Sequence, residues 1–303
     1  MKPLRPALRP ALSGERRNLP TAAGQLSYYV AGPDVVAATR PLLLIHSINA
    51  AGSAYEIKPI YDHYRQTRQV YALELPGFGF SDRRDVEYTP RRMTDAIHAI
   101  VEEIARRHGG VTVDALALSL SSEFLARAAV ETPQAFRTLA LISPTGFSRK
   151  GPRYDPPGTT RGMPGMLRFL RFPLWNRPLY WLLTTRPSIR YFLRRTWGSV
   201  NIDEGLADYD FATAREPGAR HAPYFFVSGF LFSGDIGSIY DCVQLPVWLV
   251  HGMRGDFVDY THAATVDQRP NWLRQVFPTG ALPHFERPDG FIAAYDVFLA
   301  RQP

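Results

Sequence analysis

The chain has 303 residues, 45% of them hydrophobic and 21% charged, so it is long enough to bury a full hydrophobic core. Its formal net charge of +7 favours anionic partners and does not determine a fold. A single cysteine, Cys242, excludes an internal disulfide framework and favours a reducing compartment. The first twenty residues lack the apolar run of a secretory signal, so we expect a cytoplasmic protein.

Strand-like apolar segments alternate with amphipathic helical segments along most of the chain. This alternation predicts an α/β fold with a mostly parallel central sheet flanked by helices on both faces. We predict strands at residues 24–32, 41–47, 69–77, 112–120, 137–144, 245–252 and 272–280, and helices at 88–110, 121–133, 260–268 and 288–301.

The alternation stops at about Gly146 and resumes at Leu245, which predicts an insertion in the core domain. We therefore divide the chain into an N-terminal extension that we expect to be flexible (1–20), a core domain (21–146 and 245–303) and a mostly helical cap insertion (147–244).

Ser119 is the candidate nucleophile. In "ALALSLSSEFLARAA" it stands where a buried strand joins a helix, and a sharp turn at such a join exposes a serine hydroxyl above the sheet edge. Glycines usually stand two residues to either side of such a serine, because strand and helix pass closely. Here those places hold the small residues Ala117 and Ser121. Alone, this motif is also compatible with a serine that only caps a helix.

Three further segments stand in the order expected for one known architecture. "LLLIHSINAAGSAYE" follows a predicted strand, "ALELPGFGFSDR" follows the next strand, and "LVHGMRGDFVD" follows the insertion. With Ser119, they make the chain resemble the α/β-hydrolase superfamily, in its cap-containing form. The resemblance implies an α/β-hydrolase fold, an oxyanion hole formed by the backbone amides of Ile48 and Leu120, and Asp256 as the triad acid.

Each of these assignments has a structural alternative. Asp256 could serve only to shape its loop, and Asp259, three residues further on, competes for the acid role. His46 and His251 both end predicted strands, where a histidine usually has a structural role.

The general base is where the sequence departs from the superfamily. The pattern Gly-His-x-Pro-x-x-Glu-x-Pro is matched from Gly280 to Pro288 except that Ala281 replaces the histidine. A free serine hydroxyl is a poor nucleophile at neutral pH without a base. Three explanations remain open: His284 takes over as base, the protein binds a small acyl or carbonyl ligand without triad hydrolysis, or Ala281 is an introduced substitution.

The insertion is strongly basic. Residues 149–200 contain eleven Arg or Lys and one acidic residue, Asp155, interleaved with leucines and aromatic residues. A helical cap over an apolar pocket, contact with an anionic membrane surface and a solvated surface are all compatible with this pattern. Nucleic-acid binding is not expected, because no known nucleic-acid-binding motif accompanies the stretch.

The sequence therefore predicts a serine hydrolase that acts on a small apolar ester or thioester through Ser119, Asp256 and His284. The alternative is a catalytically impaired member of the same fold that binds an acyl or carbonyl ligand. Neither a cofactor nor a metal ion is expected, since "GFGF" lacks the further glycine and helix start of a phosphate-binding loop.

Overall fold

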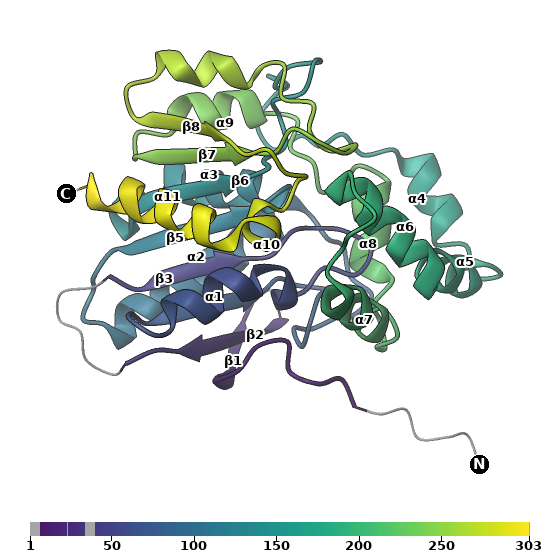
Figure 1. The fold of residues 1–303 in the computed structure, drawn as a ribbon. Helices are drawn as coiled ribbons and strands as arrows, with labels where there is room; N and C mark the ends of the chain where they lie inside the picture. The colour runs from purple at the N-terminus through teal and green to yellow at the C-terminus, as the bar shows by residue number, and fades with distance from the viewer. Residues whose placement is uncertain (1–6, 23, 34–39, 303) are drawn as a thin grey trace.

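The computed structural model describes residues 7–22, 24–33 and 40–302 (Figure 1). In these residues one sheet contains eight strands in the order β1-β2-β4-β3-β5-β6-β7-β8. β1 pairs antiparallel with β2, and β2 antiparallel with β4, while all the other neighbours are parallel. The prediction of a mostly parallel sheet is confirmed. The strands are β1 Glu15–Thr21, β2 Gly24–Ala31, β3 Leu42–Ile45, β4 Val70–Glu74, β5 Val113–Leu118, β6 Phe136–Ile142, β7 Val247–His251 and β8 Trp272–Val276.

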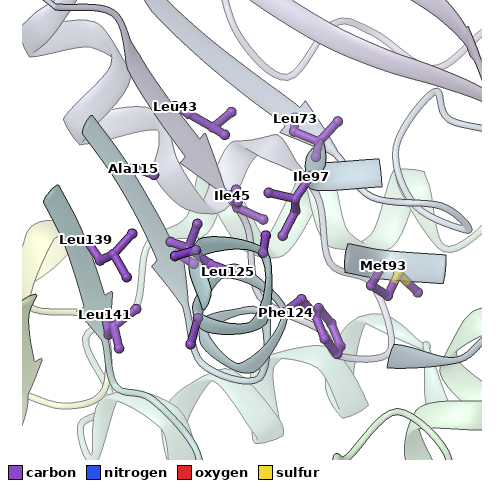
Figure 2. Packing of buried hydrophobic residues seen from close by; sticks show 14 of the residues in the cluster. Leu43, Ile45, Leu73, Met93, Ile97, Ala115, Phe124, Leu125, Leu139 and Leu141 are labelled. Carbon is purple, nitrogen blue, oxygen red and sulfur yellow. The ribbon is translucent and has the colours of Figure 1, made fainter. Parts of the chain in front are cut away.

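Helices cover both faces of the sheet, and the alternation of side chains along β3 shows why. Leu43 and Ile45 pack on one face with residues of α2, α3 and α9, as Figure 2 shows for part of this cluster. Leu42 and Leu44 point to the opposite face, against α1 and α11. Because both faces are buried here, β3 is a continuous apolar run. The core helices are α1 Lys58–Tyr64, α2 Pro90–Arg107, α3 Ser121–Glu131, α9 Ile236–Cys242, α10 Pro283–Glu286 and α11 Pro288–Ala300.

The longest core helix begins where the sequence predicts. Thr89 caps α2 by accepting a hydrogen bond from the backbone N–H of Arg92, and Pro90 occupies the first helical position. Proline is tolerated there because its missing N–H has no partner within a helix.

Five inserted helices lie together at one side of the sheet (Figure 1). They are α4 Pro164–Leu170, α5 Asn176–Leu183, α6 Arg186–Trp197, α7 Glu204–Thr213 and α8 His221–Val227. The Tyr180 hydroxyl donates a hydrogen bond to the Ala50 carbonyl at 2.8 Å and so joins α5 to the loop after β3. In α9, which the sequence places in the insertion, Ile236 and Tyr240 belong to the core cluster.

The sheet also begins earlier than the sequence predicts. Residues 15–20 of the expected flexible extension belong to β1, which pairs with β2. This strand has no apolar alternation, because its side chains are exposed or half-buried, so the sequence pattern could not reveal it. Residues 1–6 of the extension lie outside the described residues. The predicted helix at 260–268 is a 3₁₀ helix, Ala263–Gln268.

Candidate functional site

The loops after β3 and β5 follow the carboxyl ends of two neighbouring central strands. These strands are parallel neighbours, with β4 beyond β3 on one side and β6 beyond β5 on the other. The chain therefore leaves β3 and β5 in opposite directions. Open α/β sheets bind ligands at the carboxyl ends of two strands that diverge in this way. The Ser121 hydroxyl joins the two loops by donating to the His46 carbonyl at 2.6 Å.

Ser119 forms a sharp turn between β5 and α3. Its φ of 52° lies in the left-handed region, where a side chain is strained by about 1–3 kcal/mol. Its backbone N–H donates to the Ile142 carbonyl at 2.8 Å, which holds the turn against β6. The side chain is half-buried, and no described residue hydrogen-bonds to its hydroxyl. The turn therefore leaves the Ser119 hydroxyl, at the carboxyl end of β5, without a hydrogen-bond partner in the described chain.

Two backbone amides in the loops after β3 and β5 also have no partner among the described residues. Leu120 caps α3 in a helical conformation, so its N–H belongs to the first turn, where helix amides lack internal acceptors. Across residues 7–22, 24–33 and 40–302, no acceptor is found for the N–H of Leu120 or of Ile48. Both residues are buried. Unpartnered amides beside a helix N-terminus favour a negatively charged oxygen.

The buried carboxylate of Glu56 holds the loop that carries Ile48. It accepts hydrogen bonds from the Ser47 N–H at 2.7 Å and from the Asn49 side-chain amide at 2.6 Å. Burial raises the pKa of Glu56, and the bonds from Ser47 and Asn49 oppose that rise. The sequence analysis missed Glu56. The only signal in the sequence was a single acidic residue inside the apolar stretch "SAYEIKPIY".

His46 has a structural role. Its Nε2 accepts a hydrogen bond from the Leu75 N–H at 3.0 Å, and its Nδ1 lies 2.6 Å from the Ser47 carbonyl. Burial lowers the pKa of His46 to about 4, so the ring is neutral near pH 7. With both ring nitrogens engaged, His46 has no nitrogen left to accept a proton from a serine.

Ala281 follows β8 and is buried. Its N–H donates to the Thr196 carbonyl at 3.0 Å, and its carbonyl accepts from the Ser143 hydroxyl at 2.6 Å. Ser143, at the end of β6, shares with Ser119 a positive φ, here 49°. The backbone at the expected base position is thus fixed from two sides, and its methyl side chain cannot carry a proton.

His284 lies three residues further, in α10, and is fully buried. Its Nε2 lies 2.7 Å from the Glu56 backbone carbonyl, which can only accept, so this nitrogen carries the proton. The other nitrogen, Nδ1, is buried without a partner among the described residues. Burial lowers the pKa of His284 to about 4. In the described part of the chain no hydrogen bond joins His284 to Ser119 or Asp256, so its role as base stays a prediction.

Asp256, the predicted acid, follows β7 at the surface. Its side chain is 41% exposed and pairs with the guanidinium of Arg195 in α6. Its N–H donates to the Arg195 carbonyl at 3.0 Å. The competing candidate, Asp259, accepts from the Arg149 N–H at 2.9 Å and from the Thr261 hydroxyl at 2.8 Å, which fits a loop-shaping role. The contacts of both carboxylates are therefore with loop and insertion residues.

The end of α6 packs against both loops that would carry the acid and the base. Asp256 N–H and Ala281 N–H bond to the consecutive carbonyls of Arg195 and Thr196. Gly255 has a φ of 90°, and a Cβ there would lie 2.4 Å from the Arg195 carbonyl oxygen. Only glycine fits so close an approach. Backbone contacts from the insertion therefore hold the loops that carry Asp256 and Ala281 in place.

The loops after β3 and β5 thus carry a serine hydroxyl and two backbone amides without hydrogen-bond partners, and no imidazole is hydrogen-bonded to that serine among the described residues. The same residues contain no group of three or more His, Cys, Asp or Glu side chains that could hold a metal ion.

Solved structures show the same fold. A serine hydrolase involved in carbazole degradation is 18% identical, with a TM-score of 0.70, covering 95% of this chain and 99% of the other. A meta-cleavage product hydrolase from Pseudomonas fluorescens IP01, solved with acetates, is 16% identical, with a TM-score of 0.69, covering 94% and 97%. A bacterial membrane phospholipase A is 18% identical, with a TM-score of 0.65, covering 94% and 86%.

Among curated proteins, none matches the chain significantly. The sequence profile of the family described as "Alpha/beta hydrolase family" matches residues 42–294, which is most of the chain. The order of the strands and the turn at Ser119 are consistent with this match. The chain belongs to the alpha/beta hydrolase family.

Proposed function

We propose that this protein binds the acyl or carbonyl group of a small apolar ligand at Ser119, without hydrolysing it through a Ser-His-acid triad. The proposal rests on one contrast, between the polar groups that are free at the site and the side chain at the position expected for the base. The Ser119 hydroxyl and the amides of Ile48 and Leu120 have no partners among the described residues, whereas Ala281 stands at the base position.

The chemistry follows from these groups. Two free N–H donors and a hydroxyl would suit a carbonyl oxygen or a carboxylate, because each is an oxygen acceptor. Deprotonating the serine is a separate task that needs a neighbouring base. A mutant meta-cleavage product hydrolase with the same fold was solved with acetates, which makes a carboxylate a sensible first probe.

A second candidate is hydrolysis of an apolar ester or thioester through Ser119. The left-handed backbone at Ser119 favours it, because strained conformations concentrate at active sites. This candidate needs a base, and His284 would have to leave its hydrogen bond to the Glu56 carbonyl to reach the serine.

Calorimetric titration with octanoate and with octanol tests the proposal. The two probes share an alkyl chain, and only octanoate offers the carboxylate that the amides would bind. We expect octanoate to bind at least tenfold more tightly, and Ser119→Ala to weaken its binding about fivefold, as for one lost hydrogen bond.

Ser122→Ala is the matched control. Ser122 lies in the first turn of α3, three residues after Ser119, and its hydroxyl already donates to the Ala117 carbonyl at 3.3 Å. Its loss should leave octanoate binding unchanged. Equal affinity for octanol and octanoate, or equal effects of the two serine variants, would argue against a carbonyl site at Ser119.

A further inference from the structure

The outer end of the insertion exposes many large apolar side chains. Of 19 exposed large hydrophobic residues in the described chain, eleven fall within residues 163–200. Leu174 is 76% exposed, Leu182 63% and Trp181 57%. Isolated exposed apolar residues are ordinary, but such a concentration marks a surface that contacts something.

Most of these side chains lie on α4, α5 and the turn between them, and these elements are at the end of the molecule farthest from the sheet (Figure 1). We call this surface the insertion tip and define it by Met166, Phe169, Phe172, Leu174, Trp181 and Leu182. Trp175 contacts both Phe169 and Phe172, so the turn is itself an aromatic cluster.

The charge around the insertion tip is positive. Residues 156–202 contain eight arginines and no acidic residue. Arg171, Arg186, Arg190 and Arg195 pair with carboxylates elsewhere in the chain. By contrast, the exposed Arg168 and Arg177, which lie on the insertion tip, form no ion pair with any described residue.

We propose that the insertion tip docks on the surface of an anionic lipid bilayer. Aromatic and aliphatic side chains would enter the interface, while Arg168 and Arg177 would face lipid phosphates. Exposed aliphatic residues such as Leu174 and Leu182 favour a bilayer over a nucleic acid, which offers stacking faces and phosphates but no hydrocarbon layer. No described helix is long and apolar enough to cross a membrane, so the contact is peripheral. This inference does not depend on the chemistry at Ser119.

Co-sedimentation with vesicles tests the proposal on the full chain. We expect binding to phosphatidylcholine vesicles that contain phosphatidylglycerol, and at least tenfold weaker binding to phosphatidylcholine alone. Trp181→Ser with Leu182→Ser should weaken binding to the anionic vesicles at least tenfold, because two buried apolar contacts are lost. Arg168→Glu with Arg177→Glu should weaken it at least as much, and added salt should reduce wild-type binding.

Two control pairs separate the insertion tip from general hydrophobicity and charge. Met253→Ser with Phe257→Ser removes exposed apolar side chains outside the insertion. Arg9→Glu with Arg301→Glu makes the same change of net charge at exposed positions far along the chain. Both pairs should bind anionic vesicles like the wild type.

Three results would overturn the proposal. Equal binding to both kinds of vesicle, or none to either, would exclude an anionic bilayer as the partner. Equal losses in the control pairs would exclude the insertion tip as the contact. A dimer in gel filtration that Leu174→Asp dissociates, without vesicle binding, would instead make the insertion tip a contact between two copies of the chain.

Discussion

The site at the carboxyl ends of the parallel strands has two halves, and they differ in which polar groups lack a hydrogen-bond partner. On the side of β3 and β5, the Ser119 hydroxyl and two backbone amides have no partners in the described residues. On the side of β7 and β8, Asp256 pairs with Arg195, Ala281 N–H bonds to Thr196, and His284 bonds to Glu56. Holding a carbonyl group and moving a proton are separable functions of this fold, and the described geometry favours the first.

The two halves also depend on different kinds of interaction. The free amides are backbone groups, so any sequence that makes the same turns retains them. The base is one side chain, and a single alanine removes it.

Glu56→Ala tests what holds the carbonyl-binding half. The change leaves the buried N–H of Ser47 and the amide of Asn49 without their acceptor. We expect the free energy of unfolding to fall by about 4 kcal/mol, because each unsatisfied donor costs roughly 1–3 kcal/mol. Urea denaturation measures this fall.

Glu56→Gln is the control for that change. It keeps the size of the side chain and one carboxamide oxygen as acceptor, so it should cost less than half as much. If alanine and glutamine cost the same, or if both cost under about 1 kcal/mol, Glu56 does not hold the loop.

The turn at Ser119 could be predicted from the sequence and the contacts of α6 could not, for a physical reason. The turn follows from a buried strand that runs directly into a helix, which is a local pattern. The register of Gly280, Pro283 and Glu286 places Ala281 where the family pattern has a histidine, and its role there stays a prediction. The contacts of α6 with Gly255 and Ala281 join segments far apart in sequence, so no local pattern could reveal them.

His284→Gln tests the buried state of that histidine. Burial lowers its pKa from 6.5 to about 4, so the unfolded chain binds more protons between those values. The stability that this group contributes is present above pH 6.5 and is lost as the pH falls through 4. Between pH 7 and pH 4 the wild type should lose about 3 kcal/mol more than the variant.

Glutamine at this position can still donate to the Glu56 carbonyl, so the variant should fold. Unfolding free energies measured across that pH range for both proteins give the comparison. Parallel pH profiles would mean that His284 titrates freely in the folded protein and is accessible for proton transfer.

Arg195→Ala tests the exposed ion pair with Asp256. Both side chains are more than one-third exposed, so solvent screens the pair and its contribution to stability is small. We therefore expect almost no change in the midpoint of thermal unfolding. The backbone contacts of Arg195 and Thr196 remain in the variant. A large fall in that midpoint would show that the side-chain pair, and not the backbone of α6, holds this half of the site.

Turnover of p-nitrophenyl esters of increasing chain length tests whether the chain lacks a functioning triad base. We expect wild type, Ser119→Ala and His284→Gln to differ by less than about tenfold in kcat/KM. Ala281→His should raise kcat/KM at least tenfold, and the gain should disappear when Ser119→Ala is added. The contradictory result is wild-type activity that Ser119→Ala and His284→Gln each reduce by orders of magnitude, since members of a triad act as a unit.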